Sequence, residues 1–387
     1  MVMKRTFQMK LYDLLLFLYV VYKWVTSTYL PFPDAMKYPL VVLIFLLAFY
    51  LTFKYMKLTT GRLFLVVSFA LVSFISFWHN KNYIIADAAM VLGSCSLSYD
   101  YIVRRVRISC LLLISLPFMF SVLGFIPDQT IYRPESGITA HSFGFSYYSR
   151  FAYPVMCAIL CQCYIWRRRL LLYRVIVLFL LSYLLYMVSG TLLQVLTCLF
   201  LIAVAYITKR VHWDLRKKWI VLTTSLIYPL ICIFTYLTSK VYLLSDVLTD
   251  FSDLNAFSKG RASLNETAFQ KYDVTLFGQM IEMDAGYYAR NYFYIDSGYV
   301  LILLEQGLLY TVIVMIFYMI LVSKVCKAQN LYLLMYLMFF SIVNTFNSFL
   351  VESLYNPIIL ATFAYIIQNE GFNKALVKRP THEHTLL

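Results

Sequence analysis

The sequence predicts an all-α, polytopic integral membrane protein, with about 12 transmembrane helices in a range of about 10 to 13 and one large extracytoplasmic loop. Three features of the 387-residue chain lead to this class. Of its residues, 61% are apolar and only 13% are charged, and the mean hydropathy is +0.73. Soluble domains are usually about 45–50% apolar and about 25% charged. The composition therefore excludes a water-soluble enzyme and a disordered chain.

Apolar stretches recur along the whole chain, and most approach the length of about 20 residues that crosses a hydrocarbon core of about 30 Å. No linker separates them, so we assign residues 1–387 to a single membrane domain. The candidate spans lie at 11–30, 37–53, 62–78, 83–98, 108–126, 151–166, 173–188, 190–207, 219–238, 298–322, 331–348 and 357–369.

Positive charge is distributed unevenly between the loops that these spans leave. With the N-terminus in the cytoplasm, most of the 33 Lys and Arg residues fall in cytoplasmic segments, among them 54–62, 104–107, 167–174 and 209–218. Lys and Arg retained on the cytoplasmic side set the orientation of membrane proteins. We therefore expect both termini in the cytoplasm. The net charge of +14 follows from this topology, and we expect no nucleic acid as a partner.

The eight cysteines fall in predicted spans or on the cytoplasmic side. No disulfide framework is expected from this placement. The pair Cys161-x-Cys163 has no second pair to complete a zinc site, and Asp250-x-x-Asp253 is a common spacing. We therefore predict no metal and no cofactor.

Two predicted outer segments are longer than the other connections. The first, 127–150, contains Arg133, Arg150 and His141, and the second, 239–297, is the most polar part of the chain. Within the second, residues 261–271 have the pattern of a short amphipathic helix, and Leu276-Phe277-Gly278 gives a turn signal after it. Long loops in compact proteins are often functional, and we expect this one to be partly helical.

Polar side chains inside the spans are informative, because a charge at the centre of a bilayer costs about 2.5–3.5 kcal/mol on insertion scales. For any single residue, an interhelical hydrogen bond is the simpler explanation. Most of them, however, lie near the predicted outer ends of their spans, which favours a polar cavity that opens outwards. The residues are Asp87, Gln194, Glu305, Asn344, Asn347 and Glu352.

The outer loops offer arginines where the topology rule disfavours them, at Arg133, Arg150 and Arg261. A guanidinium group binds phosphate oxygens through two parallel hydrogen bonds and keeps its charge. Arginines on the outer side therefore indicate an anionic ligand at the membrane surface; contacts with lipid headgroups and solvated loop charges are the alternatives. No nucleotide-binding, HExxH or G-x-S-x-G motif accompanies them.

Several short motifs resemble one family of membrane enzymes. The chain contains Arg133, His141-Ser142-Phe143-Gly144-Phe145, Gly260-Arg261, Leu276-Phe277-Gly278, Asp296-Ser297-Gly298, Leu304-Glu305-Gln306-Gly307, and Glu352 with Asn356. In order and location these are similar to the R…HSxGF, R-x10-G and later outer motifs of the O-antigen, capsular and exopolysaccharide polymerase (Wzy) family. That family belongs to the O-antigen polymerase/ligase superfamily.

The resemblance implies a metal-independent glycosyltransferase in the bacterial cytoplasmic membrane. It would transfer a glycan from undecaprenyl diphosphate to a sugar hydroxyl of a second lipid-linked repeat unit, with a chain-length regulator and a flippase as further partners. His141 and Asp296 are the expected catalytic residues. The expected substrate-binding residues are Arg133, Arg150, Arg261, Glu305 and Glu352.

Two other functions remain open from the sequence. A ligase of the same superfamily would transfer finished glycan to a different acceptor. A lipid-sugar flippase or other transporter, without catalysis, would need a charged pathway that reaches both faces of the membrane, whereas the polar residues here concentrate near one end of the spans.

Overall fold

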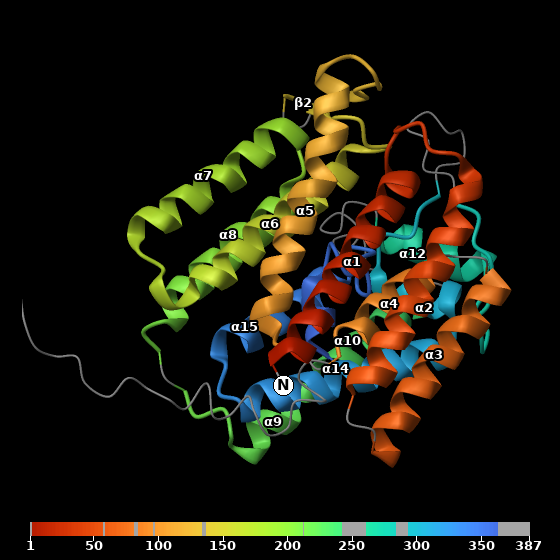
Figure 1. The fold of residues 1–387 in the computed structure, drawn as a ribbon, viewed down its shortest axis with the longest axis vertical. Helices are drawn as coiled ribbons and strands as arrows, with labels where there is room; N and C mark the ends of the chain where they lie inside the picture. Colours follow the sequence, from red (N-terminus) through yellow and green to blue (C-terminus); the bar gives the residue numbers. More distant parts are fainter. Residues whose placement is uncertain are drawn as a thin grey trace, which may run out of the picture.

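The computed structural model is mostly helical (Figure 1). It describes residues 2–56, 59–80, 84–95, 97–133, 137–211, 213–241, 261–283 and 293–362. Parts of the predicted large outer loop, 242–260 and 284–292, lie outside the described residues, as does the end of the last predicted span.

The first part of the chain forms five helices that pack together: α1 (Val2–Ser27), α2 (Lys37–Tyr55), α3 (Thr60–Asn80), α4 (Ile84–Gly93) and α5 (Tyr99–Val122), with a short 3₁₀ turn, η1 (Asp34–Met36), before α2. Helix α4 contacts α1, α2 and α3. Its residues from Ile85 to Gly93 are all buried. Small side chains allow this close packing, since a Cβ atom at Gly93 would lie 2.3 Å from a methyl carbon of Leu15.

A short antiparallel hairpin follows α5, formed by β1 (Thr130–Arg133) and β2 (Ile138–His141). Its register pairs Thr130 with His141 and Arg133 with Ile138. The chain then continues through α6 (Tyr148–Trp166), η2 (Arg167–Arg169), α7 (Leu172–Ser189) and α8 (Leu192–Thr208). Strand β2 lies against the end of α7, as Figure 1 shows near the top of the view.

The last part of the chain is more interrupted. Helices α9 (Lys218–Ser225) and α10 (Ile227–Val241) lead to α12 (Arg261–Lys271) in the large loop. Beyond the loop come α13 (Gly298–Leu301), the π-helical segment η4 (Ile302–Gln306), α14 (Leu308–Lys327), α15 (Leu331–Val343) and η5 (Pro357–Leu360).

Six helical segments within the described residues are long and apolar enough to cross a membrane: 37–55, 60–80, 99–122, 172–189, 218–240 and 308–327. Many of their large apolar side chains are exposed, for example Phe64 at 70% and Leu180 at 61%. Contiguous apolar surface of this extent is typical of a lipid-facing protein. The prediction of an α-helical membrane protein is confirmed, and the number of about 12 spans stays a prediction.

Three predicted spans take a different form in the structure. The span at 83–98 becomes α4, which has 10 residues and a length of about 15 Å at 1.5 Å per residue. The span at 298–322 is interrupted at Gly307, and the span at 331–348 ends as a helix at Val343. Hydropathy detects apolar residues that are buried in protein as readily as those that face lipid, which explains all three differences.

The segment 344–356, which follows α15, has no regular helix, yet most of it is buried, with Leu350, Ser353 and Asn356 at 0% exposure. Non-helical backbone at membrane depth is tolerated only where protein or a water-filled cavity surrounds it. Such broken elements often form the binding sites of membrane proteins.

The described part of the large loop packs onto the membrane helices through a small hydrophobic cluster of its own. Ala268 and Phe269 of α12 contact residues of the segments 281–283 and 293–295 and of the start of the next helix. Gly278 and Gly307 lie at a close backbone crossing, where the amide of Leu308 donates to the carbonyl of Thr275 at 2.9 Å. This crossing fixes the loop motif at 276–278 against the π-helical segment η4.

We predict that Gly278→Ala strongly destabilises the protein. Gly278 has φ of +89°, and a Cβ atom there would lie 2.1 Å from the carbonyl oxygen of Glu305. The left-handed conformation costs about 1–2 kcal/mol, and the contact adds about 1–3 kcal/mol. Thermal unfolding in detergent, followed with a thiol-reactive dye, measures the change because all eight cysteines are buried.

Gly137→Ala is the matched control, because Gly137 has φ of +67° and no atom within 4 Å of an added Cβ. Gly137→Ala should lower the stability only by the free energy of the left-handed conformation, about 1–2 kcal/mol. Equal unfolding temperatures for the two variants would contradict the close crossing.

Candidate functional site

The predicted site residues of both outer segments gather at one end of the helices, where α1 ends, α6 begins and α7 ends. The amide of Ser146 donates to the carbonyl of Ser27 at 3.0 Å, and the amide of Tyr29 donates to the carbonyl of Gly144 at 2.9 Å. These bonds join the segment after the hairpin to the end of α1. We call this part of the molecule the site end.

Arg133 is held by the structure around the hairpin. Its Nη1 donates to the carbonyl of Gly190 at 2.8 Å, its Nη2 donates to the hydroxyl of Tyr148, and its guanidinium lies 4.4 Å from the centre of the Tyr148 ring. Gly190 closes the C-terminus of α7 with φ of +61°. Arg133 therefore connects the hairpin, α6 and α7.

His141 lies on the opposite face of the hairpin from Arg133. Side chains alternate between the faces of a strand, and Thr130, the partner of His141, stands three residues before Arg133. His141 Nδ1 lies 2.6 Å from Oδ2 of Asp128, while Asp128 Oδ1 accepts from the amides of Ser142 and Phe143. Asp128 thus orients the imidazole, and the sequence analysis did not identify it.

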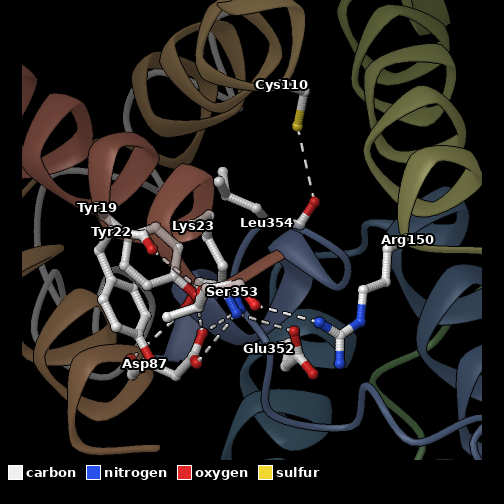
Figure 2. A network of polar contacts seen from close by, with 10 residues as sticks. Tyr19, Tyr22, Lys23, Asp87, Cys110, Arg150, Glu352, Ser353 and Leu354 are labelled. Atoms are coloured by element: carbon white, nitrogen blue, oxygen red, sulfur yellow. Dashed lines mark hydrogen bonds and ion pairs between the residues drawn. The ribbon is translucent and has the colours of Figure 1, made fainter. Parts of the chain in front are cut away.

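A buried ion cluster joins α1, α4 and the non-helical segment after α15 (Figure 2). Lys23 Nζ lies 3.0 Å from Oε2 of Glu352 and 3.8 Å from Oδ2 of Asp87. Asp87 also accepts from the amide of Ser353 at 2.8 Å and from the hydroxyl of Tyr19. Asp87 is therefore held by two hydrogen bonds and an ion pair, with 6% of its side chain exposed, whereas the side chain of Glu352 keeps 31% exposure.

Lys23 is the second residue of the candidate site that the sequence analysis did not identify. It stands inside the first predicted span, where a charge is costly and usually has a partner. That position was the available signal. The partners, Asp87 and Glu352, are far away in the sequence, so only the fold identifies them.

Arg261, at the start of α12, and Asp296, just before α13, form an ion pair within the large loop. Arg261 Nε donates to Asp296 Oδ2 at 3.0 Å, with side-chain exposures of 32% and 26%. Burial raises the pKa of Asp296, although the charge and hydrogen bond of Arg261 oppose this. A carboxylate with a raised pKa is a better proton acceptor than an ordinary one.

Two tyrosines lie within electrostatic range of both this pair and the buried ion cluster. Burial raises the pKa of Tyr294, which also experiences the charges of Arg150, Asp296 and Glu352. Tyr153 experiences those of Asp296, Glu352 and Arg261. Side chains of the two predicted outer segments therefore face one common region.

Arg150 belongs to the same region. Its guanidinium points toward Glu352 in Figure 2, and its Nη1 donates to the carbonyl of Thr26 at 3.2 Å and to the hydroxyl of Ser146 at 3.0 Å. The site end thus brings together Lys23, Arg150, Arg261, Asp87, Asp296 and Glu352.

Glu305 lies at a different place, in the π-helical segment η4 (Ile302–Gln306). Its carbonyl accepts from Asn80 of α3 at 2.6 Å and from the amide of Gln279 at 3.2 Å, and its Oε2 accepts from Gln306 at 3.3 Å. None of these contacts is with a member of the buried ion cluster. π-helical turns occur often at functional sites, and here η4 anchors the large loop.

The described residues contain no group of three His, Cys, Asp or Glu side chains suited to a metal ion. No family model, no curated protein and no solved structure matches this chain. The fold and the site together define the class: an α-helical membrane protein with a partly buried cluster of cations, carboxylates and tyrosines at one end of its helices.

We predict that Lys23→Met lowers the yield and the unfolding temperature, because it leaves two carboxylates without their cation. Removing one partner of a buried ion pair costs about 3–5 kcal/mol. The double variant Lys23→Met, Asp87→Asn keeps the net charge of the cluster and should recover most of the loss in the same dye-based unfolding measurement. A Lys23→Met protein as stable as the original would contradict the buried cluster.

Proposed function

We propose that this protein polymerises lipid-linked glycan repeat units at the outer face of the bacterial cytoplasmic membrane. The observation that supports this function best is the convergence of Arg150, Arg261 and Lys23 with Asp296 and Glu352 at one end of the apolar helices. Cations suit a diphosphate, and carboxylates and tyrosines suit sugar hydroxyls. A ligand with both groups and a lipid tail matches this combination.

In the proposed reaction, a hydroxyl oxygen of the acceptor sugar bonds to the anomeric carbon of the donor glycan. The bond from that carbon to the diphosphate oxygen breaks, and its electron pair leaves on undecaprenyl diphosphate. Arginines that face the developing charge stabilise it without reorganisation. Arg261 and Arg150 take this role in our proposal, because both lie beside the carboxylates where the acceptor would enter.

Asp296 takes the hydroxyl proton in this proposal. One of its oxygens is held by Arg261, its pKa is raised by burial, and it lies in the region that Arg150 and Glu352 share. His141, the first choice from the sequence, is oriented by Asp128 on the hairpin face away from Arg133. We propose that it contacts the diphosphate or its lipid from that side.

The site does not favour the flippase alternative, since the described ion cluster lies at one end of the helices. A ligase would use the same chemistry, and the length of the product separates the two. A ligase-deficient cell accumulates long, unattached chains, whereas a polymerase-deficient cell accumulates single repeat units.

We predict that the site end faces the outside of the cell. Single cysteines introduced at Thr130 and Asp273, which are exposed, should react with an impermeant maleimide on intact cells, and one at Arg216 should react only after permeabilisation. The eight native cysteines are buried and give little background. Labelling of Arg216→Cys alone on intact cells would reverse the orientation and exclude an outer-face reaction.

We predict that Arg261→Lys shortens the surface glycan by lowering the polymerisation rate about ten- to a hundredfold, as expected for the loss of one charge-assisted hydrogen bond of about 1.5–3 kcal/mol. Lysine keeps the charge but loses the planar fork. The measurement is the repeat-length profile in cells that lack the native chain and carry each variant.

Lys271→Arg, in the same helix α12 (Arg261–Lys271) and outside the ion pairs described, is the control and should leave the profile unchanged. An unchanged profile when the whole protein is absent would refute polymerisation. A normal repeat-length profile in Arg261→Ala would refute the proposed role of Arg261 but would not refute polymerisation by the protein.

A further inference from the structure

The amide of Asn347 is buried without a hydrogen-bond partner for its donor group. Asn347 is 4% exposed, and its Nδ2 has no hydrogen-bond partner among the residues that the structure describes. Its Oδ1 accepts from the hydroxyl of Tyr153 at 3.2 Å, which leaves the Nδ2 donor open. A buried donor without a partner is costly, so this amide is suited to bind a ligand that carries a hydrogen-bond acceptor.

A second unsatisfied atom lies in the same turn. Asn344 is completely buried, and its Oδ1 has no partner within the described segments. The backbone carbonyls of Asn344 and Asn347 both accept from the amide of Gly298 at 2.9 Å, two residues after Asp296. An open donor and an open acceptor thus flank one backbone crossing, and a hydroxyl group, which both donates and accepts, fits such a pair.

Aromatic rings adjoin this turn. The ring of Tyr153 lies 4.9 Å from that of Phe349 and 5.1 Å from that of Tyr355. Aromatic faces carry negative partial charge, and they attract the C–H faces of a sugar ring. The ammonium nitrogen of Lys23 lies 5.3 Å from the ring centre of Tyr355. Tyr153 and Tyr355 therefore lie between Asn347, which bonds to Tyr153, and Glu352, which pairs with Lys23.

Glu352 provides acceptors at the other side of these rings. Lys23 holds its Oε2 at 3.0 Å, and a carboxylate has about four acceptor positions. The side chain is 31% exposed, and Tyr153 experiences both its charge and that of Asp296. A hydroxylated ring over Tyr153 would therefore meet a carboxylate, an amide donor and the proposed proton acceptor together.

We propose that Asn347, Tyr153 and Glu352 form a subsite for one sugar ring of the acceptor glycan, and that Lys23 positions Glu352 within it. The identification of the ligand as acceptor glycan rests on the proposed function. The unsatisfied amide, the ring cluster and the half-open carboxylate are independent of it and support a polyhydroxylated ligand.

The test measures glycan binding without turnover. The full chain is placed in lipid nanodiscs and titrated calorimetrically with oligosaccharides released by partial acid hydrolysis of the surface polysaccharide of the same cells. Isomaltotriose serves as the unrelated glycan. We expect the native protein to bind the cell's own oligosaccharides and not isomaltotriose.

The decisive variant is the double change Tyr153→Phe, Asn347→Leu, which removes both partners of one hydrogen bond together with the unsatisfied donor. Replacing both partners by apolar groups is close to neutral for stability. We expect an equal or higher unfolding temperature and an affinity about tenfold lower or worse. Loss of binding without loss of stability is not expected of residues that serve packing alone.

Two further variants complete the design. Glu352→Gln keeps the shape but removes the charge, and should also lower the affinity. Tyr228→Phe removes a buried hydroxyl that donates to the carbonyl of Leu337, away from the proposed subsite, and should leave the affinity unchanged.

The proposal is overturned if the native protein does not distinguish the two glycans, or if the double variant binds as tightly as the native protein. Failure of the polymerase function appears in a different measurement, the repeat-length profile of cells without the protein. The two conclusions therefore succeed or fail separately.

Discussion

The site end depends on the ion pairs of Lys23, because its ammonium group lies between the carboxylates of Asp87 and Glu352, which come from two other parts of the chain. Asp87 comes from a short buried helix, and Glu352 from a segment without regular structure. A charge buried in a membrane protein needs a partner. One partner of Lys23, Asp87, also accepts a hydrogen bond from the backbone amide of Ser353 in the non-helical segment. Helix α1, helix α4 and the non-helical segment therefore hold one another in place.

The charged side chains at this end of the molecule are of two kinds, those buried in ion pairs and those that remain partly exposed. Asp87 accepts two hydrogen bonds, forms an ion pair with Lys23 and has little exposure, so it serves the structure. Glu352, Arg261 and Asp296 keep between about a quarter and a third of their side chains exposed and are available to a ligand. Arg133 lies between these cases, since its guanidinium already binds Gly190 and Tyr148. Its substitution would disturb the hairpin before it disturbed any ligand.

The broken helices explain how such a site fits into an apolar protein. Interruptions at Gly307 and after Val343 expose backbone groups that must find partners within the protein. They find them in Asn80, Gln279 and Gly298. The same interruptions bring the large loop, through Gly278, into direct backbone contact with the membrane helices. The loop is therefore anchored at the π-helical segment η4, in addition to the ion pair of Arg261 with Asp296.

The sequence alone determined the class of the protein, because lipid selects for composition and hydropathy, which require no knowledge of contacts. It also drew attention to the two segments that carry Arg150, Arg261 and Asp296, since arginines in segments predicted to lie outside depart from a simple charge rule. Only the tertiary structure decided which charges meet. Lys23 and Glu352 are 329 residues apart, and Asp128 reaches His141 across a hairpin. The same limit explains α4: apolar residues that are buried in protein and apolar residues that face lipid have the same hydropathy, and only packing against α1, α2 and α3 distinguishes them.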